Sequence, residues 1–375
     1  MTYALLALWR LGWILLQDGI VAYEDWAPLS TIEDLFRPYT VPWDFLHNLG
    51  SPVPLTTLGN LIYNIPLLAL AGILGSAVMA VKVQLLLMLW LSGISWAIYF
   101  RKLTLSDFGA FLGGLWMMFN PFINSRFELA HGTMILAYIL SPLLLLSFHD
   151  LLFQSMIGRG IQALLLSLII GLLSPAMIFM NLLFITLLSL APFRPSGKNL
   201  IQRVPRLSLF ISMALLLIIS LVLVTGAGVP SINAIRAEEA GIPGDIVIAL
   251  ERYPGFIAAL LFSITIGLYA YRCRRQPSSE VTLTYLSAIL ISSTFTAIII
   301  LLALQPRSQV FRILFYNVPG LQLFREVNKL LFFPIIGVGL LFAKIGQHIN
   351  GELRGARLPV LAAAFMILTL SSVWP

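Results

Sequence analysis

Long apolar stretches separated by short polar segments dominate this chain. An α-helix needs about 20 predominantly apolar residues to cross the hydrocarbon core of a bilayer. Ten stretches approach that length: 83–100, 106–120, 132–153, 161–175, 177–192, 207–226, 254–271, 281–304, 329–347 and 357–373. An N-terminal stretch, 3–17, is interrupted by Arg10, and we expect it to be a first span rather than a cleaved signal. The pattern predicts an all-α polytopic bundle of about eleven transmembrane helices.

The composition agrees with a membrane protein. Of the 375 residues, 59% are hydrophobic and only 10% are charged, whereas soluble domains carry about 25% charged residues. The net charge of +7 comes from basic residues scattered between the apolar stretches. Such a distribution indicates membrane topology rather than a nucleic-acid partner.

One apolar segment, 53–82, decides the topology. Its Pro66, Gly72 and Gly75 predict a juxtamembrane or re-entrant segment rather than a full span. With that assignment, thirteen of the 23 Lys and Arg residues fall in loops on one side, and twelve of the 16 acidic residues fall on the other. The basic side is cytoplasmic by the positive-inside rule. We therefore expect one transmembrane domain over 1–375, multi-pass in the plasma membrane, with a cytoplasmic N-terminus.

This topology leaves long segments on the outer, extracytoplasmic face. They are a long first outer loop at 18–82, a second outer loop at 120–132, and two late outer loops at 227–253 and 305–328. The cytoplasmic loops are short and basic, so we expect any chemistry on the outer face.

The first outer loop carries an acidic pair, Glu24 and Asp25, beside Trp26 and just after the first span. Carboxylates this close to a bilayer are costly to desolvate unless something binds them. A divalent cation such as Mg²⁺ or Mn²⁺ prefers such oxygen ligands, and a carboxylate here could instead act as general base on a sugar hydroxyl. The alternative is a solvated acidic loop with interfacial aromatic anchors.

In the second outer loop, Glu128 and His131 are spaced i, i+3. On one helix they would share a face and could share a ligand. A metal site would need further ligands, which would have to come from the first outer loop. The alternative is an ordinary polar loop end.

Two basic residues, Arg325 and Lys329, stand at the start of a late span with i, i+4 spacing. Cations on one helical face at the lipid boundary suit the phosphate or pyrophosphate of a membrane lipid. The alternative is snorkelling to lipid headgroups.

The sequence lacks the motifs of two common enzyme classes. The sequence has neither a Gly-x-x-x-x-Gly-Lys-Ser/Thr phosphate loop nor a His-Glu-x-x-His motif. Arg10 interrupts the N-terminal stretch and Lys82 ends the 53–82 segment, and the other charged residues of the apolar stretches lie near the ends of those stretches. Ion-coupled transporters usually carry acidic groups at the bilayer midplane, so this pattern disfavours a transporter.

Three motifs together resemble the GT-C class of membrane glycosyltransferases, the multi-spanning archaeal and bacterial kind. They are Tyr23-Glu24-Asp25-Trp26 after the first span, Phe119-Asn120-Pro121 followed by Ala130-His131-Gly132 in the second outer loop, and Phe324-Arg325 with Lys329 before a late span. The resemblance implies a lipid-linked sugar donor and an acceptor glycan, lipid or protein that meet at the outer face.

The same resemblance implies roles for the six candidate residues. Asp25, with Glu24, would be the catalytic carboxylate. Arg325 and Lys329 would bind the polyprenyl phosphate of the donor, and Glu128 and His131 would bind the acceptor or a metal. The class often has a strict Asp-x-Asp in the second outer loop, which this sequence lacks, so a need for Mg²⁺ or Mn²⁺ stays open. A lipid or polysaccharide transporter and a non-catalytic scaffold of the same fold are the alternatives.

Overall fold

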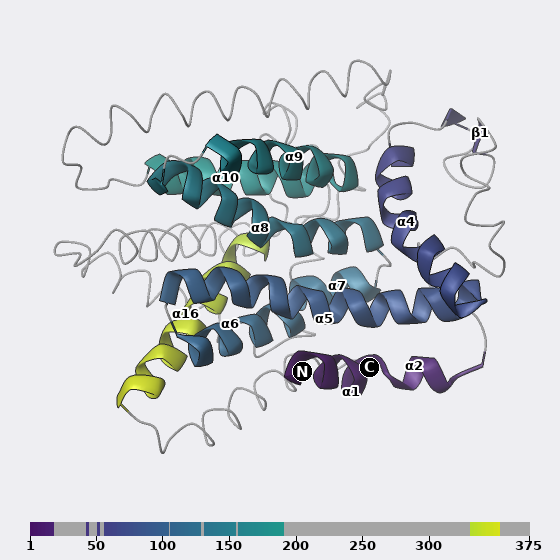
Figure 1. The fold of residues 1–375 in the computed structure, drawn as a ribbon, viewed down its shortest axis with the longest axis horizontal. Helices are drawn as coiled ribbons and strands as arrows, with labels where there is room; N and C mark the ends of the chain where they lie inside the picture. The colour runs from purple at the N-terminus through teal and green to yellow at the C-terminus, as the bar shows by residue number, and fades with distance from the viewer. Residues whose placement is uncertain are drawn as a thin grey trace, which may run out of the picture. The chain divides into compact units, whose positions relative to one another are not determined.

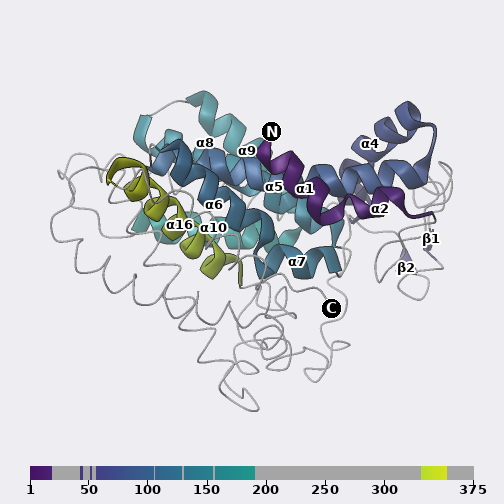
Figure 2. The ribbon, with the colours of Figure 1, turned by 90° about the horizontal axis from the view of Figure 1, so that it is seen from below.

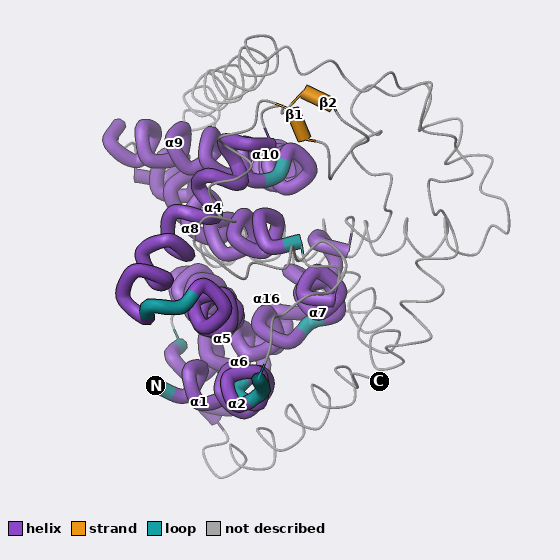
Figure 3. The backbone as a smooth tube through the Cα atoms, turned by 90° about the vertical axis from the view of Figure 1, so that its right-hand side faces the viewer, coloured by secondary structure: helices purple, strands orange, loops and turns teal. Residues whose placement is uncertain are grey.

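The computed structural model describes residues 1–18, 43–44, 51–52, 56–104, 106–128, 131–154, 157–190 and 331–352. Within these residues the secondary structure is helical, apart from a two-residue antiparallel pair formed by β1 (Trp43–Asp44) and β2 (Ser51–Pro52) (Figure 3). The predicted spans at 207–226, 254–271, 281–304 and 357–373 lie outside the described residues, so the number of eleven spans stays a prediction.

The described helices follow the apolar stretches closely (Figure 1). They are α1 (Thr2–Leu11), α2 (Trp13–Leu16), α4 (Thr56–Leu74), α5 (Ala77–Thr104), α6 (Asp107–Phe119), α7 (Pro121–Glu128), α8 (Gly132–Gln154), α9 (Ile157–Leu173), α10 (Pro175–Leu190) and α16 (Phe332–Glu352). Two of them, Ala77–Thr104 and the Gly132–Leu151 part of α8, are long and apolar enough to cross a membrane. The prediction of an all-α architecture is confirmed for this part of the chain.

The segment predicted to be juxtamembrane or re-entrant forms two helices with a sharp turn between them. Helix α4 continues through Pro66 as far as Leu74. Gly75 then adopts the left-handed conformation, with φ of 66°, which glycine tolerates without steric penalty. The hydroxyl of Ser76 accepts a hydrogen bond from the Met79 amide at 3.2 Å and caps the next helix. Helix α5 thus begins at Ala77, ahead of the span predicted from residue 83.

The chain divides into two compact units. The first comprises Met1–Ile94 and Ser125–Ile178 with Leu209–Gly228, and the second comprises Ser95–Asn124, Phe179–Ser208 and Val229–Pro375. In the first unit α8 packs along α9, and α4 contacts both helices. Figure 1 shows α8 and α9 running side by side. Ala163 and Ile170 of α9 are fully buried in this packing.

Among the described helices of the second unit, α6 packs along α16, and Figure 2 shows the two side by side. Glycines let the two backbones approach. A Cβ placed on Gly346 would lie 2.7 Å from the Cα of Gly109, and one on Gly109 would overlap the carbonyl oxygen of Ala343. The indole N–H of Trp116 donates to the carbonyl of Ile335 at 2.9 Å. Small residues at such a contact are typical of helix pairs in membranes.

Two helices of the first unit expose large apolar side chains on one face. Leu5 and Trp9 of α1 are 56% and 57% exposed, and Ile161 and Leu165 of α9 are 59% and 56% exposed. Each pair is spaced i, i+4, so each forms one helical stripe. Monomeric soluble proteins seldom leave such stripes uncovered, whereas a lipid-facing helix requires them.

Replacing Gly109 or Gly346 with alanine should destabilise the second unit. The added methyl group would force the α6 and α16 backbones apart, and overpacking of this kind costs about 1–3 kcal/mol. We expect a lower unfolding midpoint in detergent for either variant. Gly72→Ala is the matched control, because a Cβ there meets nothing within 4 Å and alanine favours the helix. Equal midpoints for Gly109→Ala and Gly72→Ala would contradict the packing described here.

Candidate functional site

The second outer loop predicted from the sequence is largely helical. Asn120 ends α6, and its side-chain amide N–H donates to the Met117 carbonyl at 2.9 Å. Its side-chain oxygen accepts from the Ile123 amide at 3.1 Å and so caps α7. Pro121 occupies the first position of α7, where its missing N–H costs nothing. The Asn-Pro pair therefore ends one helix and starts the next.

Arg126 and His131 join the end of α7 to the start of α8. The backbone N–H of His131 donates to the carbonyl of Arg126 at 3.0 Å, and the carbonyl of His131 accepts from the Ile135 amide at 3.0 Å to begin α8. The side chains also meet, with Nη1 of Arg126 lying 2.8 Å from Nδ1 of His131. Arg126 is fully buried and His131 is half-buried. The pair holds a permanent positive charge and an imidazole together in a fixed turn.

Tyr63 of α4 lies against the first residue of α8. A Cβ placed on Gly132 would come within 2.6 Å of the Tyr63 ring and 2.7 Å of its hydroxyl oxygen. The carbonyl of Tyr63 accepts a hydrogen bond from the Gln84 side chain of α5 at 3.3 Å. A side chain at position 132 would therefore force the Tyr63 ring to move.

Lys82 connects α5 to the end of the N-terminal helices. Its ammonium group donates to the carbonyl of Gln17 at 2.5 Å, and the residue is 5% exposed. Gln17 follows α2 at the point where the first outer loop begins. A second buried cation thus lies at the predicted outer end of an apolar helix.

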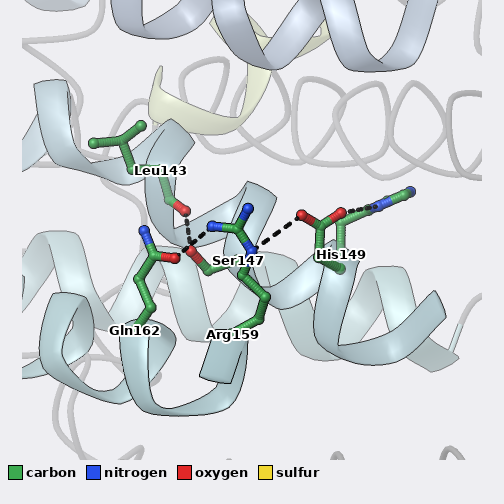
Figure 4. A network of polar contacts seen from close by, with 6 residues as sticks. Leu143, Ser147, His149, Arg159 and Gln162 are labelled. Atoms are coloured by element: carbon green, nitrogen blue, oxygen red, sulfur yellow. Dashed lines mark hydrogen bonds and ion pairs between the residues drawn. The ribbon is translucent and has the colours of Figure 1, made fainter. Parts of the chain in front are cut away.

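A different polar cluster occupies the other end of α8 (Figure 4). The Asp150 carboxylate lies 3.6 Å from Arg159 Nε of α9 and 3.6 Å from His149 Nδ1. Arg159 also donates to the Gln162 side chain at 2.6 Å. The negative charge of Asp150 is compensated by the positive charge of Arg159, so this ion pair links α8 to α9 and leaves no excess charge for a ligand.

The two clusters, one just before α8 and one near its end, are separated by about the thickness of the hydrocarbon core. His131 and Asp150 are separated by roughly 30 Å along a helix that rises 1.5 Å per residue, which matches the hydrocarbon core. No Asp, Glu, Lys or Arg lies between them. The spacing suits a helix that crosses a bilayer, and the assignment of the Arg126–His131 end to the outer face stays a prediction.

The structure describes few of the residues predicted to form the site. Glu24, Asp25, Arg325 and Lys329 lie outside the described residues. Glu128 is the last residue of α7, and only its backbone is described. His131 lies between α7 and α8, so it does not share a helix with Glu128, as a common i, i+3 face would require.

Sequence reasoning assigned no specific role to Arg126, Tyr63 or Lys82. A signal for Arg126 was present, since it is a basic residue in a short outer loop, where the positive-inside rule does not favour one. The contact between Tyr63 and Gly132 had no such signal, because the two residues are far apart in the sequence.

Within the part of the chain that the structure describes, no group of three His, Cys, Asp or Glu side chains could hold a metal ion. At His131 the neighbouring guanidinium would also repel a cation. The metal-ligand role considered for Glu128 and His131 stays a prediction, because the side chain of Glu128 lies outside what the structure describes. Glu24 and Asp25 lie outside the described residues, so their suitability as metal ligands stays a prediction.

Comparison with known proteins found no match, whether with family models, with curated proteins or with solved structures.

Replacing Gly132 with alanine should displace the Tyr63 ring and destabilise the junction of α4 with α8 by about 1–3 kcal/mol. The effect should largely disappear when Tyr63 is already alanine, because the methyl group then has room. Unfolding midpoints of Gly132→Ala, Tyr63→Ala and the double variant measure this coupling. Strictly additive effects would mean that the ring and Gly132 do not interact.

Proposed function

We propose that this chain is a membrane glycosyltransferase that moves a sugar from a polyprenyl-phosphate donor to an acceptor hydroxyl at the outer face. The resemblance of its three outer motifs to the GT-C class supports the proposal. The observation that carries it is the burial of two basic side chains on the predicted outer side, Lys82 near the start of the apolar helix α5 and Arg126 in the short helix α7. Ionisable groups in such positions mark functional sites by default. A lipid-linked phosphate is a substrate that brings negative charge to that depth.

In the proposed reaction the acceptor hydroxyl oxygen attacks the anomeric carbon of the donor sugar. The bond from that carbon to the phosphate oxygen breaks, and polyprenyl phosphate leaves. Asp25, assisted by Glu24, takes the proton of the acceptor hydroxyl as general base. Arg325 and Lys329 hold the phosphate and stabilise the charge that develops on it. Glu128 orients the acceptor, and no step requires a nucleotide.

A lipid or polysaccharide transporter is the second candidate function. A transporter needs polar or charged groups along a path through its spans. In the described helices the acidic residues Asp107, Glu128, Asp150 and Glu352 lie within about one turn of a helix end. None of these carboxylates therefore lies midway along a described helix, and this disfavours a charged path through these spans.

Replacing Asp25 with asparagine should lower the rate of sugar transfer by about 10²–10⁴-fold, the usual contribution of a general base. The assay is transfer of radiolabelled sugar from polyprenyl phosphate in reconstituted vesicles. Asp18→Asn is the control, because Asp18 is an exposed acid at the start of the same loop. Wild-type rates for Asp25→Asn would rule out Asp25 as the base.

Replacing both Arg325 and Lys329 with glutamine should weaken donor binding. Hydrogen bonds to charged groups contribute about 1.5–3 kcal/mol each, so KM for the donor should rise at least tenfold. KM for the acceptor should change little. Lys344→Gln serves as control, since Lys344 is exposed and bonds to Gln347. An unchanged KM for the donor would assign the phosphate to other residues.

A further inference from the structure

The ammonium group of Lys82 ties the end of the N-terminal helices to α5. It donates to the carbonyl of Gln17 at 2.5 Å, although the two residues are 65 positions apart in the sequence. Gln17 has an extended ψ of 135° and marks the point where the chain leaves α2. We infer that Lys82 is a positioning residue that holds both ends of the segment 18–81 together on one side of the membrane, and that α4 therefore does not cross the bilayer.

The end of a helix is a suitable partner for a buried cation. Gly12 keeps the helical conformation, so α1 and α2 run almost without interruption to Leu16. The last carbonyls of a helix lack partners within it and carry a partial negative charge. Lys82 is 5% exposed, and among the residues that the structure describes no carboxylate forms an ion pair with it. Because a buried cation needs a compensating group, separating Lys82 from the Gln17 carbonyl would be costly.

Length and composition alone would allow α4 to cross the membrane. Its 19 residues carry no charge and extend over about 28 Å at 1.5 Å per residue, close to the thickness of the hydrocarbon core. The turn at Gly75 joins the end of α4 directly to the start of α5. Lys82 lies less than two helical turns into α5. The contact of Lys82 with Gln17 therefore places the end of α4 on the same side of the membrane as the end of α2.

A crossing by α4 would require a second crossing that the sequence does not provide. If α4 crossed, its first residue, Thr56, would lie on the opposite side of the membrane from Gln17. Residues 18–55 would then have to carry the chain back through the bilayer. The longest uncharged run among them is 45–55, whereas a transmembrane helix needs about 20 predominantly apolar residues. Helix α4 therefore begins and ends on one side.

The contacts of α4 agree with this placement. Figure 1 shows α4 at one end of α8 and running across its direction. Tyr63, in the first half of α4, lies against Gly132, the first residue of α8. The Tyr63 carbonyl also accepts a hydrogen bond from the side chain of Gln84, in the third turn of α5, at 3.3 Å. Helix α4 thus lies at the end of a helix that is long enough to cross a membrane, rather than along its length.

The effect of Lys82 on the reaction rests on the proposed function. The first outer loop starts directly after Gln17, and the candidate base Asp25 follows eight residues later. Lys82 acts on the reaction only through the chain that it holds. Misplacing a catalytic group by about 1 Å can cost about 10²-fold in rate, so loss of this contact lowers kcat and leaves KM for the donor nearly unchanged.

Labelling of single cysteines in the full chain tests the placement of α4. Asp18→Cys, Thr56→Cys and Ser76→Cys, each in a Cys273→Ser background, are treated with a membrane-impermeant maleimide in sealed vesicles. We expect all three to react from the same side, and Gly158→Cys, near the start of α9, to react from the other. Protection of Thr56→Cys or Ser76→Cys on the side where Asp18→Cys reacts would overturn the placement of α4.

Dipolar EPR tests whether Lys82 sets the contact. Nitroxides at Leu16 and Met79, which are 88% and 36% exposed, report the separation of α2 from the start of α5. Lys82→Met cannot donate, so the distances should lengthen and their distribution broaden, whereas Lys82→Arg should keep the wild-type distribution. A control pair within α5, Met79 and Leu91, should not change. Unchanged distances between Leu16 and Met79 in Lys82→Met would show that Lys82 does not hold the two helices together.

Transfer kinetics of the same variants separate this inference from the proposed function. Lys82→Met should lower kcat at least about tenfold, and Lys82→Arg should restore it. If Lys82→Met does not fold, Lys82→Gln, which is too short to reach the same carbonyl, takes its place. Lengthened EPR distances with an unchanged kcat would refute the role of Lys82 in the reaction. The expected labelling and EPR distances in a chain without transfer activity would refute the proposed function but not the contact or the placement of α4.

Discussion

The junction between α7 and α8 depends on a double connection between Arg126 and His131. One hydrogen bond joins the backbones and another joins the side chains. Since the guanidinium is fully buried, removing it would leave a polar cavity at the end of two helices, and burying it alone would be costly. The turn is therefore held by a charged group whose orientation is fixed by backbone geometry. Gly132 follows His131 directly and lies against Tyr63, so the start of α8 also contacts α4.

In the second unit, helices associate through close backbone contact rather than through a polar pair. The hydrophobic effect cannot drive apolar helices together inside lipid, so close backbone contact has to replace it. Gly109 and Gly346 provide that contact between α6 and α16. Trp116 adds a hydrogen bond to a backbone carbonyl and so satisfies its indole N–H within the protein. The same principle explains why α1 and α9 can present leucine, isoleucine and tryptophan outward.

The described helices could be predicted from the sequence because the length of an apolar stretch is a local property. The predicted spans at 106–120 and 132–153 agree with α6 and α8 to within a residue at each end. The local pattern could not show that 56–82 forms the helix α4, a turn at Gly75 and the start of α5. The break between the two helices depends on the left-handed φ of Gly75. For the site, the sequence singled out His131 but neither its partner Arg126 nor the tyrosine that covers Gly132. Those contacts depend on how the chain returns on itself, and periodicity carries no information about that.

The fit of Tyr63 onto Gly132 has an evolutionary consequence. A Cβ at position 132 would come within 2.6 Å of the Tyr63 ring, so a larger residue there forces the ring to move. A smaller residue at 63 would remove that conflict in a lineage that acquires alanine or serine at 132. Relatives of this chain should therefore show the two positions covarying in size. Such paired substitutions would trace a contact between two helices that are distant in the sequence.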